Sequence, residues 1–183
     1  SAVSNMENSK NSDLEIVFFE NVNMGNGQYA ENPWLQEMPN PIDRTVWGNH
    51  LTIPIAFDGD RRYESLKDLK DGDMVELKIG ENTIEVPVVR VFGQMQGTVG
   101  LALGYGRSKA GKVGTGVGVN INPFLPLNEG FTQYFVEDVS ISDKMGVDKD
   151  FACVQYHHTI GVTAVDPETG EKYNADEKEL VDD

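Results

Sequence analysis

Residues 74–93, MVELKIGENTIEVPVVRVFG, decide the fold class of this chain. Apolar side chains alternate with polar ones over residues 75–79, and the same alternation returns over residues 84–88. Alternation of this kind is typical of strands that bury one face, and the Gly-Glu-Asn at residues 80–82 can form a turn between them. The stretch therefore predicts a β-hairpin.

Further strand candidates lie on both sides of this hairpin. Apolar runs rich in β-branched and aromatic residues occupy residues 14–20, 51–57, 97–105, 131–141 and 151–165. Pro54 indicates that the second of these is an edge strand or carries a bulge, because proline has no N–H to donate. No alternation of strands with long helices is present. We therefore expect a mainly β fold, a small barrel or sandwich of six to seven strands.

One short helix and one extended segment complete the expected architecture. Apolar residues three apart over residues 63–69 predict about two turns of amphipathic helix. Residues 32–50 contain three prolines and should run extended rather than helical. Trp34 and Trp47 are expected to pin this segment to the body of the protein, and the alternative for either is stacking against a ligand.

The overall composition limits the possible functions. Thirty acidic residues against 15 basic ones give a formal net charge of -15, which repels nucleic-acid phosphates and anionic membrane surfaces. We expect no nucleic-acid partner and no direct membrane insertion, since no apolar stretch approaches the roughly 20 residues of a membrane helix. The first residues lack the pattern of a signal peptide, and the chain is expected to be soluble.

Residues 104–120, GYGRSKAGKVGTGVGVN, combine six glycines and three cations without any acid. From Gly106 the sequence follows the nucleotide-binding pattern G-x-x-x-x-G-K-S/T except at its last position, where Val113 replaces the hydroxyl that would bind magnesium. The glycines that follow Lys112 disfavour a helix, because each costs about 1 kcal/mol relative to alanine. A nucleotide-hydrolysing P-loop is therefore not expected.

The same loop lies in a locally cationic interval. No Asp or Glu occurs from Phe92 to Asn128, and this interval contains Arg107, Lys109 and Lys112. One interpretation is that loop N–H groups and these cations receive a pyrophosphate or another acidic group. The alternative is that close chain crossings in a small barrel require the glycines, while the cations face water or pair with the acidic surface.

The remaining reactive side chains do not compose a recognisable active site. Cys153 is the single cysteine and is expected to be a small buried core residue in a strand. His157 and His158 are adjacent in a predicted strand, so they should point to opposite faces and cannot readily share a metal. His50 is isolated. We expect no catalytic residues and no metal site in this chain.

The order of the motifs supports a family resemblance. The segments LEIVFFENVNMGNGQYAENPWLQEMPNPIDRTVWGNHLTI, DLKDGDMVELKIGENTIEVPVVRVFGQMQGTVGLALGYGRSKAGKVGTGVGVN and FACVQYHHT follow one another along the chain. Together they resemble the iron–sulfur molybdopterin-oxidoreductase-like subunit of bacterial alternative complex III, a quinol-oxidising respiratory complex. The resemblance covers about residues 13–160. DLKDGDMVELKI also looks like the dinucleotide-binding domain of the wider molybdopterin oxidoreductase family.

This resemblance implies a fold and a setting. It implies a double-psi β-barrel over residues 13–165, before an acidic linker at 166–183 toward a missing ferredoxin-like domain. Iron–sulfur clusters would lie in that separate domain, and the parent would face the periplasmic side of the bacterial inner membrane. Partners would be other domains and subunits of a membrane-bound respiratory complex. Residues 1–12 are polar with nothing to bury, and we expect them to form a disordered leader.

Two roles for the barrel follow from the resemblance. It is a structural and docking module without a cofactor of its own, or it retains binding of molybdopterin guanine dinucleotide or a related nucleotide. The positions that could carry over such binding are those of the glycine-rich loop: Gly104, Tyr105, Gly106, Arg107, Lys109 and Lys112.

Overall fold

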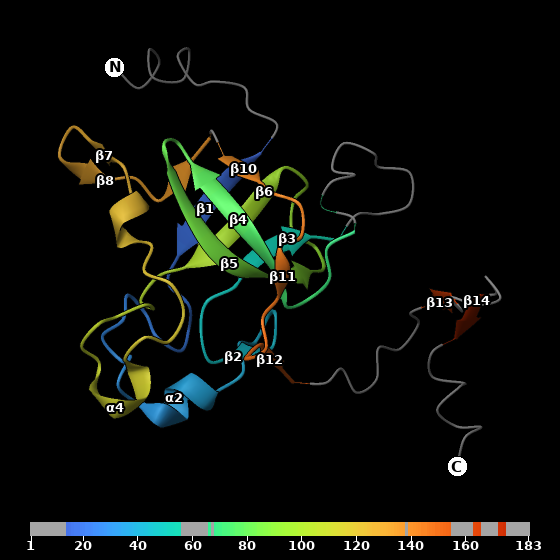
Figure 1. The fold of residues 1–183 in the computed structure, drawn as a ribbon, viewed down its shortest axis with the longest axis horizontal. Helices are drawn as coiled ribbons and strands as arrows, with labels where there is room; N and C mark the ends of the chain where they lie inside the picture. Colours follow the sequence, from blue (N-terminus) through green and yellow to red (C-terminus); the bar gives the residue numbers. More distant parts are fainter. Residues whose placement is uncertain are drawn as a thin grey trace. The chain divides into compact units, whose positions relative to one another are not determined.

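The computed structural model describes residues 14–55, 66, 68–137, 139–154, 163–165 and 172–174. The chain divides into two compact units, residues 1–153 and 154–183. The second unit contains one antiparallel pair, β13 (Thr163–Val165) with β14 (Lys172–Asn174). The first unit contains the other strands and the short helices (Figure 1).

The predicted hairpin is confirmed. β4 (Asp73–Ile79) pairs antiparallel with β5 (Asn82–Val91), and Gly80 and Glu81 alone connect them. Gly80 has a φ of 59°, in the left-handed region that tight two-residue turns require. Alternate residues of β4 are buried. The alternation in the sequence therefore corresponds to an inward and an outward face of the hairpin.

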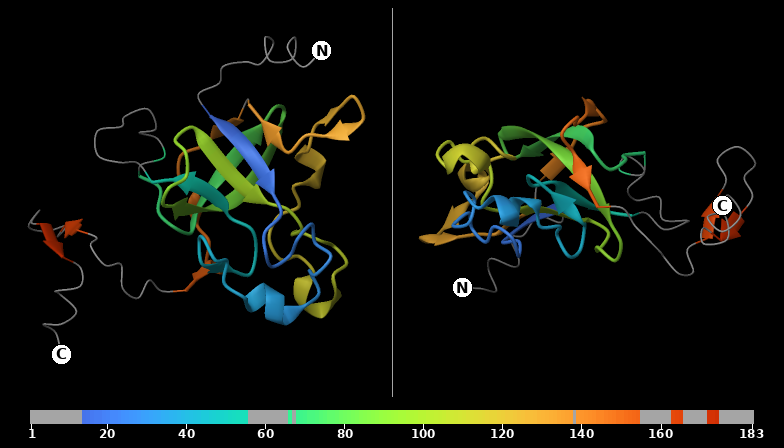
Figure 2. Two further views of the ribbon diagram at one scale, coloured as in Figure 1. Left: turned by 180° about the vertical axis from the view of Figure 1, so that it is seen from behind. Right: turned by 90° about the horizontal axis from the view of Figure 1, so that it is seen from below.

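Seven strands form a nearly closed, barrel-shaped sheet (Figure 1, Figure 2). Their order is β10–β4–β5–β3–β6–β1–β9, and β11 adds to β4. The remaining bounds are β1 (Glu15–Phe19), β3 (Leu51–Pro54), β6 (Thr98–Ala102), β9 (Phe135–Val136), β10 (Val139–Ile141) and β11 (Gly146–Val147). β1 runs parallel to β6 and β3 runs parallel to β5, whereas the other neighbours are antiparallel. A mainly β, barrel-like fold is thus confirmed.

The segment expected as one strand over residues 131–141 is broken into three, so that prediction is wrong. β8 (Phe131–Thr132) pairs with β7 (Leu127–Asn128), β9 pairs with β1, and β10 pairs with β4. β1 and β4 lie near opposite ends of the sheet order. A chain that pairs with both must leave one ladder before it joins the other, and in doing so it nearly closes the barrel.

β3 is an interior strand, so the expectation of an edge strand is wrong. It pairs parallel with β5 and antiparallel with β6, the second contact joining Thr52 to Gly100. Pro54 is the last residue of β3 and lies beyond the contact with β6, so its missing N–H does not interrupt that ladder. A Cβ at Gly100 would lie 2.6 Å from Oγ1 of Thr52, so the approach of β6 to β3 requires glycine there.

The segment 32–50 was expected to contain no helix, and this is wrong over five residues. α2 (Pro33–Glu37) begins at a proline, whose missing N–H would have no partner in the first turn of a helix. Oδ1 of Asn32 caps the helix by accepting a hydrogen bond from the backbone nitrogen of Trp34 at 3.0 Å. Trp34 itself is 80% exposed. It does not pin the segment, and Trp47 is the half-buried tryptophan.

Short elements join this segment to the end of the first unit. β2 (Thr45–Val46) pairs antiparallel with β12 (Ala152–Cys153). α4 (Gly111–Gly114) and the 3₁₀ turn η1 (Asn122–Phe124) lie between β6 and β7. In the part of the chain that the structure describes, no helix has the length and apolar character needed to cross a membrane.

Several predicted segments lie wholly or partly outside the described residues. These are the leader at 1–12, most of the helix at 63–69, the middle of the strand at 151–165 and most of the linker at 166–183. Three residues of the expected helix are described: Leu66 and Leu69 are buried in the barrel core, and Asp68 is exposed. Leu66 and Leu69 are three positions apart, the spacing of two residues on one face of the predicted amphipathic helix.

The barrel encloses one main apolar cluster. Its fully buried members come from every major strand of the sheet: Ile16, Leu51, Ile53, Val75, Leu77, Val86, Val88, Val99 and Leu101. A second, smaller cluster contains Met24, Ala30, Ala102, Tyr105 and Ala110. This second cluster packs the loop at residues 21–31 against the glycine-rich segment and thereby fixes the position of the candidate site.

Candidate functional site

The glycine loop, residues 104–120, is a place where the chain crosses itself closely. Gly104 has a φ of 97°, and a Cβ there would lie 2.5 Å from the backbone nitrogen of Gly27. A Cβ at Gly106 would overlap the backbone of residues 119–120. Both approaches are closer than any Cβ permits, so the crossing requires glycine.

The returning arm of the loop shows the same crowding. A Cβ at Gly114 would overlap the carbonyl group of Ala30, and one at Gly118 would lie 2.5 Å from Oδ1 of Asn49. These contacts join the loop to two segments far away in sequence. The interpretation that close chain crossings require these glycines is therefore confirmed.

The loop also uses its own N–H groups internally. The backbone nitrogen of Gly106 donates to the carbonyl of Val117 at 2.7 Å, and that of Gly116 donates to the carbonyl of Arg107 at 2.9 Å. These bonds hold the two arms of the loop together. A phosphate cradle needs N–H groups that point at the anion, and these two point at the opposite arm instead.

Lys112 lies in a single helical turn, and no helix starts in the glycine-rich residues 114–120 that follow, as predicted. This turn is α4 (Gly111–Gly114), which forms despite its two glycines. Oγ1 of Thr115 accepts a hydrogen bond from the backbone nitrogen of Ala110 at 3.1 Å and donates to the carbonyl of Gly111 at 2.6 Å. Side-chain bonds of this kind stabilise a turn that helix propensity alone disfavours.

The three cations of the loop are all exposed. Nη2 of Arg107 donates to the carbonyl of Asn26 at 3.0 Å, and the guanidinium group packs over Gly27. Arg107 therefore clamps the neighbouring loop. Lys109 and Lys112 form no ion pair with any residue that the structure describes.

Tyr105 is a buried packing residue. It is 5% exposed, and its hydroxyl accepts a hydrogen bond from Nδ2 of Asn21 at 2.9 Å. Burial raises the pKa of this phenol above its ordinary value, although the bond from Asn21 opposes that shift. The same asparagine also accepts from the backbone nitrogen of Met24 at 2.7 Å. Tyr105 thus packs against the loop at residues 21–31 and bonds to it, and its hydroxyl already has a partner there.

A pocket of about 360 Å³ lies beside the returning arm of the glycine loop. Four parts of the chain line it: residues 47–50, residues 74, 85 and 87 of the hairpin, residues 116–119, and residues 148 and 150. Its charged lining residues are Glu85, Asp148 and Asp150, and no lysine or arginine lines it. We call it the acidic pocket. None of the six residues predicted for cofactor binding lines it.

Asn49 joins two walls of the acidic pocket. Its Oδ1 accepts a hydrogen bond from the backbone nitrogen of Val119 at 2.8 Å, and its Nδ2 donates to the carbonyls of Ala102 and Val119 at 2.8 and 3.1 Å. The adjoining Trp47 has a φ of 51° and Gly48 a φ of 118°. The backbone turns at Trp47 and Gly48, and His50 follows two residues later.

His50 is the buried titratable group of this pocket. It is 5% exposed, and its ring contacts Phe151 edge to face at a centroid distance of 5.1 Å and an interplanar angle of 89°. Burial lowers the pKa of the imidazole, against the opposing influence of Asp43 and Asp148. The imidazole of His50 makes no hydrogen bond to any residue that the structure describes. A neutral imidazole therefore lines the pocket beside carboxylates.

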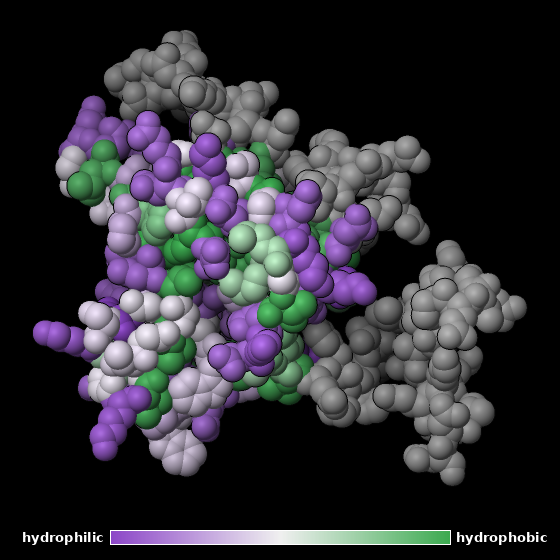
Figure 3. Space-filling model, in the orientation of Figure 1, coloured by the Kyte–Doolittle hydropathy of each residue, from purple (hydrophilic) through white to green (hydrophobic). Residues whose placement is uncertain are grey.

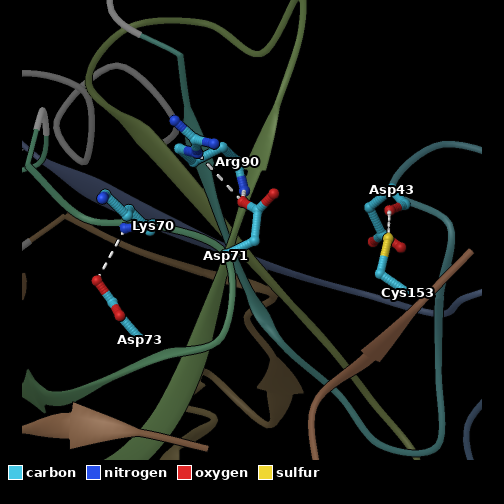
Figure 4. A network of polar contacts seen from close by, with 6 residues as sticks. All are labelled: Asp43, Lys70, Asp71, Asp73, Arg90 and Cys153. Carbon is cyan, nitrogen blue, oxygen red and sulfur yellow. Dashed lines mark hydrogen bonds and ion pairs between the residues drawn. The ribbon is translucent and has the colours of Figure 1, made fainter. Parts of the chain in front are cut away.

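Asp43, one of the carboxylates that act on His50, lies in a polar network, and Figure 4 shows its contact with Cys153. Oδ1 of Asp43 accepts hydrogen bonds from the backbone nitrogen and the hydroxyl of Thr45, at 2.9 and 2.7 Å. Sγ of Cys153 lies 3.6 Å from the carbonyl oxygen of Asp43. Cys153 is in β12, as predicted to be in a strand, but it is half-buried rather than a core residue. Burial, followed by Asp71 and Asp43, raises the pKa of its thiol.

The acidic pocket could not be found from the sequence. Its residues come from segments up to about one hundred positions apart, and His50 stands alone in the sequence without a metal-ligand or nucleophile motif. The one relevant signal was the alternative that Trp47 contacts a ligand, since Trp47 does line the pocket. His157 and His158 lie outside the described residues.

Comparisons with known proteins provide no assignment. No protein-family model matches the chain, and no curated protein matches it. Within the described ranges, no group of three or more His, Cys, Asp or Glu side chains has an arrangement that could hold a metal ion.

Proposed function

We propose that this chain is the barrel domain of a molybdopterin oxidoreductase-family subunit of a quinol-oxidising respiratory complex. In this proposal the domain is a structural and docking module, and electron transfer is the activity of the parent assembly. The observation that carries the proposal is the filling of the glycine loop by the chain's own backbone, at Gly27 and residues 119–120. A loop filled in this way stabilises the barrel and leaves little space for a phosphate group.

The proposal includes a double-psi topology for the barrel. Two parallel pairs, β1 with β6 and β3 with β5, join strands that are distant in sequence. An antiparallel contact between β3 and β6 connects the two pairs. A meander would pair each strand with its neighbour along the chain, so this interleaved order supports the double-psi alternative.

An exposed apolar hairpin supports the docking part of the proposal. Leu127 of β7 is 75% exposed and Phe131 of β8 is 77% exposed. Apolar atoms are visible at this hairpin among hydrophilic ones in Figure 3, and the same hairpin extends from the barrel in Figure 1. Large apolar side chains gathered on a protruding element are common in surfaces that meet a partner.

The alternative function is binding of molybdopterin guanine dinucleotide or a related nucleotide through the glycine loop. The exposed cations Arg107, Lys109 and Lys112 favour it. The residues fit the group poorly, however, because the loop N–H groups of Gly106 and Gly116 are bonded internally and the adjoining pocket is lined by carboxylates. A pyrophosphate in that pocket would be repelled.

Nucleotide titration and metal analysis of the purified chain test the two functions against each other. A docking module should contain no stoichiometric iron or molybdenum and should give no saturable heat with GDP or with extracted cofactor. If heat is observed, the double variant Lys109→Gln plus Lys112→Gln should abolish it, while Lys70→Gln plus Lys78→Gln at exposed sites elsewhere should not. Binding that depends on the loop lysines would replace the docking proposal by the alternative.

The family setting has a separate test in the gene itself. The proposal expects cysteine-cluster motifs of a ferredoxin-like domain in the sequence that follows residue 183, and a periplasmic location for the parent subunit. A natural gene that stops at this position, or continues without such motifs, would contradict the setting while leaving the barrel unaffected.

A further inference from the structure

We propose that the acidic pocket binds a cationic organic group, a guanidinium or an alkylammonium carried on an apolar stem. The inference concerns a surface that the proposed function does not use, so either can fail without the other. It depends on three observations: the charge of the lining, the state of His50 and the character of the walls.

The lining charge has one sign. Glu85, Asp148 and Asp150 come from β5 and from the segment after β11, and no lysine or arginine is present to neutralise them. Oδ1 of Asp148 accepts a hydrogen bond from the backbone nitrogen of Asp150 at 3.0 Å, which holds these two residues in one turn. Like charges at a shared concavity repel one another, and a bound cation relieves that repulsion.

His50 gives an independent indication of a ligand. The imidazole has no partner for its ring nitrogens among the described residues, and these nitrogens are not among the fully buried unpartnered atoms, so the pocket gives them access to solvent or to a ligand. His50 is 5% exposed and lines the pocket, and among the described residues it has the ring of Phe151 as a neighbour but no hydrogen-bond partner. Its acceptor nitrogen can receive a hydrogen bond from an N–H donor of the ligand.

The walls fit an organic cation with an apolar stem. Trp47, Pro87 and Val117 line the same pocket as the carboxylates. The volume of about 360 Å³ is near the lower end of the range of small-molecule sites, which is roughly 300–1,000 Å³. It has room for one long basic side chain or one small diamine-like molecule. Aromatic and apolar walls with a few carboxylates are the usual surroundings of guanidinium groups.

Two sources can supply such a group: an arginine or lysine side chain presented by a partner protein, and a free small-molecule cation. NMR titration of the isotopically labelled chain of residues 1–183 separates them. The probes are agmatine, a blocked tripeptide with a central arginine, and the same tripeptide with citrulline, which replaces the charged guanidinium by a neutral urea. Saturable shifts are expected at the indole of Trp47 and the amides of Gly48 and Gly118.

The expected result is binding of the arginine peptide that is at least about tenfold tighter than binding of the citrulline peptide, because the site recognises charge. Agmatine that binds as tightly as the arginine peptide identifies a free cation as sufficient. Binding of the peptide alone identifies a partner's side chain. Added salt should weaken binding in either case.

Isosteric variants locate the site. Glu85→Gln plus Asp148→Asn should weaken arginine-peptide binding by about tenfold or more, whereas the matched Glu81→Gln plus Asp143→Asn at exposed positions outside the pocket should change it less than about twofold. His50→Phe keeps the ring contact with Phe151 but removes the acceptor, and should also weaken binding.

Three outcomes overturn the inference. These are equal affinity for citrulline and arginine, no saturable shift with either arginine probe, and equal binding by the Glu85→Gln plus Asp148→Asn chain. Circular dichroism of each variant shows whether it folds, and the citrulline comparison uses the unaltered chain, so the inference remains testable if a variant does not fold.

Discussion

Oδ1 of Asn49 accepts a hydrogen bond from the backbone nitrogen of Val119 at 2.8 Å, across 70 positions of sequence. The same side chain donates to two carbonyls, those of Ala102 and Val119. One buried asparagine therefore joins the segment before β3, the end of β6 and the return of the glycine loop. It holds two walls of the acidic pocket at a fixed separation.

Replacing Asn49 should loosen this junction. Asn49→Ala removes three hydrogen bonds and leaves buried backbone groups unpaired, so we expect the free energy of unfolding to fall by roughly 2–4 kcal/mol. Urea unfolding followed by circular dichroism measures the change. Asn122→Ala is the matched control, because the Asn122 side chain bonds at an exposed site. Equal effects of the two variants would contradict the role of Asn49.

The glycine loop allows a comparison that separates backbone strain from crowding. Gly106 and Gly116 both have positive φ, 66° and 79°, but a Cβ would overlap residues 119–120 at the first and meet nothing within 4 Å at the second. Gly116→Ala should cost about 1–2 kcal/mol from its left-handed backbone. Gly106→Ala should cost roughly 3–5 kcal/mol, because overlap adds to the same strain. Similar midpoints in urea would show that the crossing is not tight.

His50 should make the stability of the protein depend on pH. Its pKa is lowered in the folded state, chiefly by burial, from an ordinary value of 6.5. Above that value both folded and unfolded chains are neutral at this site, so the group contributes nothing. As the pH falls below about 6.5, the unfolded chain binds a proton that the folded chain does not, and stability should fall by up to about 1.4 kcal/mol per pH unit.

Urea unfolding from about pH 7 to pH 5 measures this dependence. The control is His50→Phe, which retains His157 and His158 and so isolates the contribution of the pocket histidine. Its stability should vary less over that range. An unchanged slope in the variant would show that His50 is not the group responsible.

Asp73 and Asp71 form two ion pairs that differ in burial. The Asp73 side chain is 4% exposed and lies 2.7 Å from Nζ of Lys144, whereas the pair between Asp71 and Arg90 is 3.2 Å long and about two-fifths exposed (Figure 4 shows the second pair). Lys144→Met should cost roughly 1–3 kcal/mol, because it leaves a buried carboxylate without its cation. Arg90→Gln should cost less than about 1 kcal/mol.

The pH dependence distinguishes these pairs further. Burial alone would raise the pKa of Asp73, but the hydrogen bond from Lys144 and that from the backbone of Lys70 lower it overall from 3.8. Its contribution to stability is therefore present above that value and is lost as the pH falls through the lower folded pKa. In Lys144→Met the folded pKa of Asp73 should rise, so this contribution should be smaller and stability should fall less steeply as the pH drops below about 4. Acid unfolding curves that coincide with those of the unaltered chain would contradict this.

Local pattern accounts for most of what could be predicted about the fold. The alternation in β4 and β5, the turn at Gly80 and the apolar run of β1 each depend on residues close together in sequence. α2 was missed although its signals are local: Asn32 is an N-cap residue and Pro33 is favoured at the first helical position. The three prolines of residues 32–50 argued against a helix there, but Pro33 lies at the first helical position, where proline is tolerated.

Predictions that depended on pairing were less successful. The break of residues 131–141 into β8, β9 and β10 follows from which strand each piece pairs with, and the sequence of the segment does not contain that information. The interior position of β3 is similar, because Pro54 looks like an edge signal until its place at the strand end is known.

The sequence by itself determined a mainly β chain with a central hairpin, a glycine-rich crossing and an acidic surface, because side-chain alternation, backbone freedom and charge are properties of neighbouring residues. The tertiary structure decided that the barrel nearly closes through residues 135–141, and that His50, Glu85 and Asp148 line one pocket. Strand register places these three residues together across about one hundred positions, and register is set by contacts between segments rather than within them.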